Sequence, residues 1–437
     1  MSKKTKLSTN NYKGVRDFYP EDLQAQKYIF SIMREVMESF GYEEYDASLL
    51  EYTEIYAAKS GQEIAEEQTY TFKDKGGRTV SIRPEMTPTA ARMIAKKVRE
   101  LRFPVRWYSI PNIFRYESPQ KGRLREHYQL NADIFGGVDE EADMEMVTLI
   151  HKIMTKFGAK TTDFVIYIND RRILNSLYDL HGIDEKSRDP VSKLLDKRNK
   201  ITKKDFESAM REHMSEETLS AFLESISSPI KVLDAMGQDD PVVGHIINII
   251  EKLNRNNITN IFFDPTLVRG FDYYTGLVFE VFDTDPDNSR AIFGGGRYDS
   301  LVSLFSDRDI PAIGFGMGDV RLLEFLKNRS LLPEYSPETK LIVCKTENHP
   351  YSSATEVAEK FRDEGIPTEV DISGKKLKDQ ISRASKKNIP FIILVEENKE
   401  TKDKIRIKHL DSEKEKDLTL KEAVEWIKET LKNQPQA

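Results

Sequence analysis

Apolar positions along the chain repeat with two different periods, and these periods divide the sequence into regions. Residues 21–40 carry apolar side chains at helical spacing and are followed by Gly41, a common residue at the end of a helix. Strand-like stretches occupy residues 68–73, 79–83, 105–114, 128–135, 275–282 and 312–316. Short turns, such as residues 74–77, favour antiparallel pairing over the long crossovers of parallel strands. The pattern predicts an α/β core with a mostly antiparallel sheet.

Two regions depart from this pattern. Residues 170–256 are rich in Lys, Glu, Asp and Leu at helical spacing, which predicts a helical insertion within a core formed by residues 1–169 and 257–330. In the tail, strands at 340–344, 369–372 and 390–395 alternate with helices at 353–364 and 377–387. This alternation indicates a small α/β domain with a parallel or mixed sheet. We place it at residues 338–437, after a proline-containing linker at 331–337.

Composition limits the class of protein. The chain has 437 residues, more than a single core usually holds, and its apolar runs are far shorter than the ~20 residues that span a bilayer. The first residues are rich in Lys, Ser and Thr with no apolar stretch after them, so we expect no secretion signal. The single cysteine, Cys344, excludes a disulfide within the chain and a cysteine-based zinc cluster, and the seven histidines suggest no metal site. We expect a multidomain cytoplasmic protein with no bound metal and no membrane segment.

The distribution of charge along the chain is more informative about a nucleic-acid partner than the total charge. The chain has 66 basic and 73 acidic residues, a net charge of -7, which argues against a dedicated nucleic-acid binder. Residues 336–437, however, are balanced, with 20 of each sign, and the segment 374–387 holds six basic residues and one acid. Such a segment could follow a phosphate backbone. A solvated helix face is the alternative interpretation.

Four clusters combine residues that could carry chemistry. In the first, a strand leads through Arg83-Pro84-Glu85-Met86-Thr87 into a helix, so the Glu85 carboxylate could accept hydrogen bonds from an amine. A loop acid followed by a helix cap is the alternative. In the second, residues 114–133, arginines flank a loop with Gly122 near its tip, an arrangement suited to gripping phosphates. A solvent-facing hairpin would have the same pattern.

The second cluster continues into a strand on which Gln129, Asn131 and Asp133 alternate and therefore face one side. The third, residues 267–276, combines Arg269 with two tyrosines and two glycines, which suits a polar small molecule; an aromatic turn is the alternative. The fourth contains Gly294-Gly295-Gly296 and the alternating glycines of residues 314–318. These leave a strand face bare, so that a flat ligand can lie against it. A Walker-type phosphate loop is the competing interpretation, but neither run continues as Gly-Lys-Ser or Gly-Lys-Thr.

Taken together, these motifs resemble those of class II aminoacyl-tRNA synthetases, and of histidyl-tRNA synthetases in particular. Residues 13–18 are similar to the N-terminal signature of that family, 114–129 to motif 2 and 314–321 to motif 3. The most specific likeness is that of residues 267–276 to the histidine-specific peptide of these enzymes. The resemblance covers nearly the whole chain and implies a class II antiparallel core, a helical insertion and a C-terminal anticodon-binding domain. Ser48 and Val320 depart from the family's pattern in motifs 1 and 3.

The resemblance implies ATP-dependent ligation of L-histidine to tRNA(His) through a histidyl-adenylate, with ATP as a substrate, Mg2+ beside it and a homodimeric enzyme. Two alternatives remain. One is a regulatory paralogue of the synthetase in histidine biosynthesis, and the other is a non-catalytic module that senses histidine or tRNA. Such a paralogue typically lacks the histidine-specific motif and the anticodon domain, whereas this chain has both.

The family's functional residues map onto this sequence one by one. The resemblance implies catalytic roles for Arg115 and Arg269 at the α-phosphate of ATP and for Arg321 at its γ-phosphate. The residues implied in histidine binding are Glu85, Met86, Thr87, Gln129, Asp133, Tyr273 and Tyr274. Those implied in ATP binding are Arg115, Glu117, Arg123 and Arg321. Those predicted to contact tRNA are Gln120, Arg123, Lys375, Lys376, Lys378 and Arg383.

Overall fold

The computed structural model describes residues 7–57, 68–120, 122–137, 139–198, 201–237, 239–268, 273–288, 290–345, 351–394 and 404–432. The chain divides into two compact units, Met1–Leu331 and Leu332–Ala437. None of the described helices is both long and apolar enough to cross a membrane. The predicted boundaries of the core, the insertion and the linker stay predictions.

In the described part of the first unit, the largest sheet has nine strands in the order β1-β5-β7-β12-β11-β10-β8-β9, with β6 paired to β7. Its strands are β1 (Glu43–Glu44), β5 (Val105–Ser109), β6 (Asn112–Phe114), β7 (Glu126–Phe135), β8 (Phe164–Asp170), β9 (Ile261–Phe263), β10 (Leu277–Asp283), β11 (Ala291–Arg297) and β12 (Ala312–Gly318). Only the outer pairs β1–β5 and β8–β9 are parallel. The structure therefore confirms the predicted class, an α/β fold on a largely antiparallel sheet.

The predicted strand at 105–114 is in fact two strands, and this is a correction. β5 ends at Ser109 and β6 begins at Asn112, with Pro111 between them. Proline has no backbone N–H to offer a neighbouring strand, so it interrupts the ladder. Both pieces pair with the long strand β7, and β6 thereby delivers Arg115 to the end of the hairpin.

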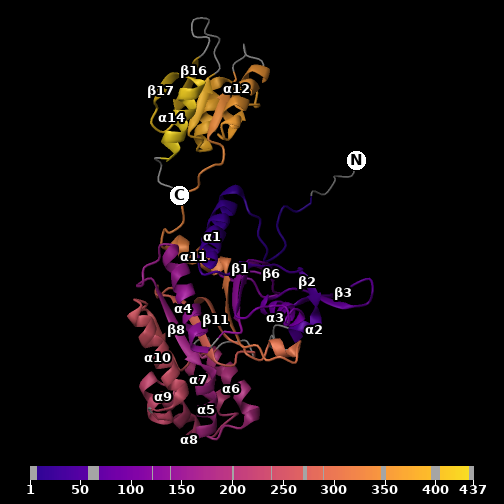
Figure 1. Cartoon of the computed structure of the whole chain (residues 1–437), viewed down its shortest axis with the longest axis vertical. Helices are drawn as coiled ribbons and strands as arrows, with labels where there is room; N and C mark the ends of the chain where they lie inside the picture. Colours follow the sequence, from indigo (N-terminus) through magenta and orange to yellow (C-terminus); the bar gives the residue numbers. More distant parts are fainter. Residues whose placement is uncertain are drawn as a thin grey trace. The chain divides into compact units, whose positions relative to one another are not determined.

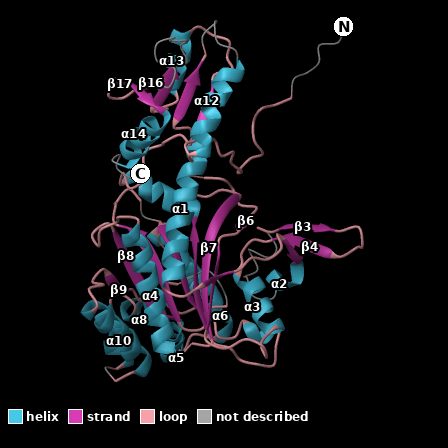
Figure 2. Cartoon of the chain, turned by 45° about the horizontal axis from the view of Figure 1, so that its top comes forward, coloured by secondary structure: helices cyan, strands magenta, loops and turns pink. Residues whose placement is uncertain are grey.

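Helices cover one face of the large sheet, as Figures 1 and 2 show. They include α1 (Pro20–Ser39), α4 (Asp139–Lys156), α10 (Pro241–Arg255) and α11 (Asp319–Asn328). Helix α1 begins with a proline, whose fixed φ suits a first turn, and Gly41 lies just beyond its end with φ of 78°. Helix α4 packs against both α1 and α10 and also contacts β12, and α10 itself contacts β8 and β9.

Smaller elements flank this core. A three-stranded sheet in the order β2-β4-β3 is formed by β2 (Leu50–Tyr52), β3 (Tyr70–Lys73) and β4 (Thr79–Ile82). Beside it lie α2 (Thr53–Ala57) and α3 (Thr87–Lys96), and a 3-10 turn covers Val302–Leu304. Helix α3 begins at Thr87, so Glu85 lies two residues before its first turn.

Between β8 and β9 the described residues form only helices and their connections. The helices are α5 (Arg171–Leu180), α6 (Glu185–Lys197), α7 (Lys203–Met210), α8 (Glu216–Ser225), α9 (Pro229–Met236) and α10. Most begin at a side-chain cap, in which an oxygen of the preceding residue accepts a backbone N–H of the first turn: Asp170, Thr202, Ser215, Ser228 and Asp240. Local sequence thus sets where these helices start.

The second unit contains a five-stranded mixed sheet in the order β14-β13-β15-β16-β17. Its elements are β13 (Leu341–Cys344), α12 (Tyr351–Asp363), β14 (Thr368–Val370), α13 (Leu377–Lys386), β15 (Phe391–Leu394), β16 (Lys404–His409), β17 (Glu415–Thr419) and α14 (Leu420–Lys432). Strand β13 pairs in parallel with β14 and β15, whereas the pairs β15–β16 and β16–β17 are antiparallel. Buried side chains such as Phe361, Phe391 and Ile427 form its core.

Candidate active site

Two strands of the large sheet place a row of polar side chains directly beside a row of glycines. On β7, Gln129, Asn131 and Asp133 alternate, and their partners on β12 are Gly318, Gly316 and Gly314. Because alternate residues of a strand face the same side, the polar row and the bare row share one face of the sheet. A cavity lies on this face.

The glycines are required because the polar side chains occupy the space where their Cβ atoms would lie. A Cβ at Gly316 would lie 2.0 Å from Nε2 of Gln129, and one at Gly314 would lie 2.2 Å from Oδ1 of Asp133. Gly296 is similarly close, because its Cβ would meet the ring of Tyr274 at 2.9 Å. The glycine-rich strands therefore make room for the site's own side chains as well as for a ligand.

Seven polar residues named from the sequence meet at this cavity, beside Gly294, Gly314 and Gly316 of the glycine-rich cluster. Those with assigned roles are Glu85, Thr87, Arg115, Gln129, Tyr273 and Tyr274, and Asn131 belongs to the predicted polar row. Sequence reasoning gave no role to Tyr298 or Phe315, which also line the cavity. Tyr298 continues the alternation of Gly294 and Gly296 by one step, and this alternation could have identified it as a residue on the same face.

One end of the cavity is formed by Glu85 and Tyr273, which come from opposite ends of the first unit's sequence. The Tyr273 hydroxyl donates a hydrogen bond of 3.0 Å to Oε2 of Glu85, and both side chains are buried. Burial, and then the negative charge of Glu85, raises the pKa of Tyr273 well above its usual value. The tyrosine therefore remains a protonated donor beside a carboxylate, a pair that presents negative charge to a cationic group.

Asp133 lies on β7 beside Gly314, a residue that lines the cavity, but Asp133 itself is not among the lining residues. Its Oδ1 accepts a hydrogen bond from the hydroxyl of Tyr298, whereas its buried Oδ2 has no hydrogen-bond partner among the described residues. Burial raises the pKa of Asp133 to about 7, although the bond from Tyr298 opposes this and the charge of Glu85 adds to it. Asp133 can thus offer an acceptor to a polar hydrogen of a ligand.

A chain of side-chain contacts runs along β7 from Asn131 to His127. Gln129 donates from Nε2 to Oδ1 of Asn131 at 2.8 Å, and its Oε1 lies 3.3 Å from Nε2 of His127. Burial, and then the positive charge of Arg115, lowers the pKa of His127 to about 3. His127 is therefore neutral at ordinary pH, and it donates from Nε2 to the amide oxygen of Gln129.

Arg115 supplies the positive charge of the cavity. It follows β6, and its Nε donates to the carbonyl oxygen of Pro84 at 2.8 Å, which ties motif 2 to the segment containing Glu85. A guanidinium held at Nε keeps its two terminal nitrogens for other partners. That geometry suits a phosphate.

Arg321 lies near the tip of the hairpin and not among the residues that line the cavity. It donates to Oδ1 of Asn288 at 2.8 Å and to the carbonyl of Arg290 at 3.0 Å, and it pairs with Glu324 at 2.9 Å. A Cβ at Gly122 would lie 2.6 Å from its Cδ. Motif 3 and the motif 2 loop therefore meet at this arginine.

The other residues assigned to ATP and histidine occupy varied positions, and their roles stay predictions. Glu117 pairs with Arg123 at 3.5 Å, and Gln120 accepts a bond of 3.2 Å from Arg290. Met86 is fully buried, with its sulfur 4.0 Å from the Arg83 guanidinium, and it does not line the cavity. Arg269, assigned to the α-phosphate, lies outside the described residues.

The predicted tRNA contacts of the tail lie around the start of α13. Lys375, Lys376 and Lys378 are exposed. Arg383, by contrast, pairs with Glu369 at 2.8 Å and with Asp371 at 3.4 Å, so it also holds the domain together.

The N-terminal signature also reaches the site, a connection that sequence reasoning had left unexplained. Arg16 pairs with Asp319 at 2.8 Å, and the same carboxylate accepts the backbone N–H of Tyr128 at 3.0 Å. The carbonyl of Gly14 accepts the backbone N–H of Arg125 at 2.8 Å. The opening segment thereby joins motif 2 to the start of the motif 3 helix.

Comparisons with known proteins agree with this arrangement. Residues 14–322 match the family model for histidyl-tRNA synthetase, and residues 340–430 match that for an anticodon-binding domain. A histidine–tRNA ligase of Leptospira biflexa is 41% identical over 98% of this chain and 99% of its own length. One of Thermoplasma volcanium is 35% identical over 97% of this chain and 99% of its own length.

Solved structures share the fold. The crystal structure of a histidyl-tRNA synthetase from Nostoc has a TM-score of 0.80 and 22% identity, and the match covers 97% of this chain and all of the other. A Bacillus halodurans structure described as an ATP phosphoribosyltransferase regulatory subunit/histidyl-tRNA synthetase has a TM-score of 0.70 and 25% identity over 87% of this chain and 97% of its own. On the family model and the curated relatives, the chain belongs to the histidyl-tRNA synthetase family.

Proposed function

We propose that the protein activates L-histidine with ATP and transfers it to tRNA(His). The main supporting observation is a cavity lined by a carboxylate–tyrosine pair, Glu85 with Tyr273, and by the cation Arg115. Tyr298 also lines it and donates a hydrogen bond to the buried carboxylate of Asp133 beside the cavity. Curated relatives named histidine–tRNA ligase match this chain over almost their whole length, which supports the same activity here.

The two carboxylates suit the two polar ends of histidine. The α-ammonium group is a cation with three donors, and Glu85 with Thr87 and Gln129 would receive it. The imidazole ring would lie near Tyr274 and Asp133, and Oδ2 of Asp133, which has no hydrogen-bond partner among the described residues, would accept a bond from a ring N–H. A site built to satisfy ring nitrogens rejects apolar amino acids, because its buried polar groups would lose their partners.

Activation joins histidine to the α-phosphate of ATP. A carboxylate oxygen of histidine attacks the α-phosphorus, the bond from phosphorus to the bridging oxygen breaks, and pyrophosphate leaves with the electron pair. Arg115 would stabilise the charge that develops on the α-phosphate, and Arg269 would act with it. Arg321 would hold the γ-phosphate, with Glu117 and Arg123 at the nucleotide. Mg2+ would enter as the counterion of the ATP phosphates and neutralise their charge.

The second step transfers the histidyl group from the adenylate to a hydroxyl of the terminal ribose of tRNA, and AMP is released. Gln120 and Arg123 of the hairpin would contact the acceptor end. Lys375, Lys376 and Lys378 would approach the anticodon region, where their exposed ammonium groups supply counter-charge for phosphates. Arg383 would act beside them.

We also propose that the enzyme is a homodimer. Apolar side chains of the small sheet are exposed, among them Leu50 and Tyr52 of β2 and Phe72 of β3. An exposed cluster of this kind marks a surface that another chain covers. Sedimentation of the purified protein would measure the assembly directly, and a monomer at micromolar concentration would contradict it.

The regulatory alternative is not favoured. The name of one structural neighbour includes a regulatory subunit, but the curated relatives that match this chain end to end are ligases, and the anticodon-binding domain is present. A sensing module would have little use for a phosphate-directed cation such as Arg115 in the cavity.

Two assays test the proposal. Wild-type protein should catalyse exchange of labelled pyrophosphate into ATP only when L-histidine is added, and should then charge tRNA(His). Arg115→Ala should lose exchange by about a hundredfold or more, the scale on which a transition-state donor acts. A wild-type protein that binds histidine without exchange would instead be a sensor, and this result would overturn the proposed activity.

A further inference from the structure

The last residue of strand β11, Arg297, and the residue that follows it, Tyr298, face opposite sides of the sheet. Tyr298, like Gly294, lines the cavity, whereas the side chain of Arg297 enters the helix layer and reaches α4. A single peptide bond therefore joins Tyr298, which lines the cavity, to Arg297, whose side chain is buried among helices.

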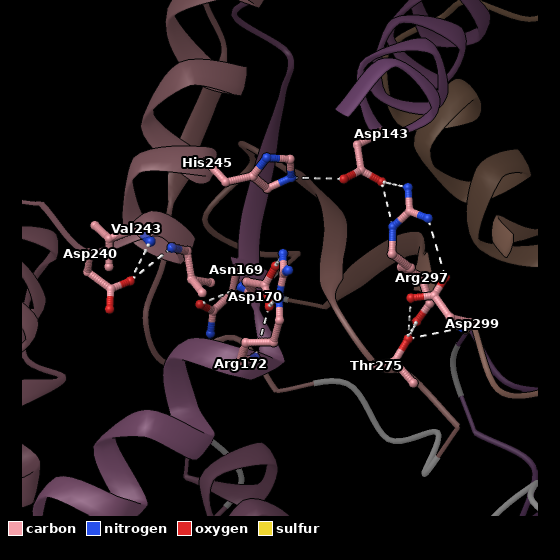
Figure 3. Close-up of polar contacts among 11 residues, drawn as sticks. Asp143, Asn169, Asp170, Arg172, Asp240, Val243, His245, Thr275, Arg297 and Asp299 are labelled. Atoms are coloured by element: carbon pink, nitrogen blue, oxygen red, sulfur yellow. Dashed lines mark hydrogen bonds and ion pairs between the residues drawn. The ribbon is translucent and has the colours of Figure 1, made fainter. Parts of the chain in front are cut away.

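Arg297 is held from two directions (Figure 3). Its Nε and Nη2 donate to Oδ1 of Asp143 on α4, at 3.1 and 2.5 Å, and its Nη1 donates to Oδ1 of Asp299 at 3.3 Å. The side chains of Arg297 and Asp143 are only 4% and 1% exposed. A planar guanidinium bonded at both ends in the interior has little freedom to move.

The other oxygen of Asp143 is engaged by the helical segment. Oδ2 lies 3.1 Å from Nε2 of His245, which α10 carries. An ionised carboxylate only accepts hydrogen bonds, so His245 is the donor and carries its proton on Nε2. Asp143 thus bridges α10 on one side and the end of β11 on the other.

Asp299 extends the link to the start of β10. Its Oδ2 accepts a hydrogen bond of 3.1 Å from the Thr275 hydroxyl, and the backbone N–H of Asp299 donates to the Thr275 hydroxyl oxygen at 3.0 Å. The N–H of Thr275 also donates to the carbonyl of Arg297 at 2.8 Å. Thr275 directly follows Tyr274, so two of the three tyrosines that line the cavity, Tyr274 and Tyr298, adjoin this network.

We propose that Arg297 is a positioning residue for histidine binding, and that Asp143 and His245 set its position from helices α4 and α10. The inference rests on the proposed function, because Tyr298 and its partner Asp133 form the proposed imidazole end of the cavity. A displacement of α10 is passed through His245 and Asp143 to Arg297, and from there to the hydroxyl of Tyr298. The helical segment is thereby coupled to amino-acid recognition at a site that it does not line.

A purely structural ion pair predicts something different. Loss of such a pair lowers thermal stability and affects histidine and ATP alike, or neither. A positioning role changes the Michaelis constant for histidine and leaves that for ATP unchanged, because Arg115 is tied to Pro84 and lies outside this network.

The first experiment compares His245→Gln with His245→Leu in full-length protein, by pyrophosphate exchange at varied histidine and varied ATP. Glutamine can still donate to Asp143 and should keep the wild-type constants. Leucine cannot, and should raise KM for histidine about fivefold, the factor that corresponds to one hydrogen bond, without changing KM for ATP. Equal constants in the two variants would overturn the role of His245.

The second experiment compares two carboxylates of the same helix. Asp143→Asn removes the charge opposite Arg297 and should raise KM for histidine about tenfold or more. Glu145→Gln is the matched control, because Glu145 holds Arg106 through bonds of 2.7 Å on β5, a strand that adds nothing to the cavity lining. It should lower only the melting temperature.

The outcomes separate this inference from the proposed function. A wild-type protein without histidine-dependent exchange would contradict the function itself. Wild-type exchange with the same histidine and ATP constants in Asp143→Asn as in Glu145→Gln would leave the function standing and refute the positioning role.

Discussion

The hydroxyl of Tyr298 donates a hydrogen bond to Oδ1 of Asp133 across an intervening strand. Asp133 lies on β7 and Tyr298 follows β11, and β12 runs between these strands. The bond is possible because the residue of β12 beside Asp133 is Gly314, whose missing side chain leaves the path open. The hydrogen bond between Tyr298 and Asp133 thus depends on a glycine at position 314.

The buried carboxylate of Asp133 lowers the stability of the folded protein, and the size of this effect depends on pH. Burial raises the pKa of Asp133 to about 7, above its unfolded value of about 3.9, so the folded protein binds the proton more tightly. Ionised Asp133 therefore destabilises the fold by up to about 4 kcal/mol above pH 7, and the penalty declines as the pH falls towards 4. Asp133→Asn should raise the melting temperature by several degrees at pH 8 and by much less at pH 5.

The same substitution should weaken histidine activation, because an amide replaces the acceptor oxygen that would receive a ring N–H. Pyrophosphate exchange measures this loss beside the melting curves. Asp307→Asn, at an exposed position, is the control and should show neither effect. A melting temperature for Asp133→Asn that is unchanged at pH 8 would contradict the raised pKa.

Alternating glycines of β12 provide a second test. A Cβ at Gly316 would lie 2.0 Å from Nε2 of Gln129, whereas the nearest atom to one at Gly318 is a carbon of the His127 ring at 3.7 Å. Gly316→Ala should displace the Gln129 side chain and raise KM for histidine tenfold or more, a factor of ~10 being equivalent to ~1.4 kcal/mol. Gly318→Ala is in ordinary contact and should remain close to wild type. Similar constants for the two variants would contradict this geometry.

Local period was enough to predict much of this site. The alternation of Gln129, Asn131 and Asp133 indicated a polar strand face, and the alternating glycines from Gly314 indicated a bare one. What the sequence could not supply was the register that places the two rows side by side, because pairing between β7 and β12 depends on packing of the whole sheet.

Long-range contacts explain what was missed. The bond from Tyr298 to Asp133 spans 165 positions, and that from Arg297 to Asp143 spans 154. Asp133 stood out in its polar strand, but Asp143 did not, since an aspartate on an amphipathic helix usually faces solvent. The burial of Asp143 becomes visible only when α4 lies on the sheet. The interruption of the 105–114 strand, by contrast, was readable from Pro111.

His127 should remain neutral over the range in which most histidines titrate. Burial, and then the charge of Arg115, lowers its pKa to about 3 from an ordinary value near 6.5. Since the folded pKa is below the unfolded one, stability is unaffected above pH 6.5 and is lost as the pH falls from 6.5 towards 3. In protein labelled at histidine, the ring signal that disappears in His127→Gln should not shift between pH 8 and pH 5. A midpoint near 6.5 for that signal would exclude the buried, neutral state.

The basic segment of the tail should contribute to tRNA binding through charge. Lys375, Lys376 and Lys378 are exposed around the first turn of α13, where the helix dipole also favours anions. Replacing all three with alanine should weaken binding of tRNA(His) and reduce the slope of log Kd against log salt by about 2, because each phosphate contact releases a counterion. Pyrophosphate exchange does not involve tRNA and should be unchanged.

The matched control removes the same charge from elsewhere in that unit. Lys414, Lys421 and Lys432 are also exposed, and their triple alanine variant has the same net charge as the first. If whole-domain charge attracted tRNA, the two variants would lose affinity equally. If the lysines of residues 375–378 contact phosphates, only the first variant should change the salt slope. Filter binding at several salt concentrations measures both, and equal slopes would show that this segment makes no specific phosphate contacts.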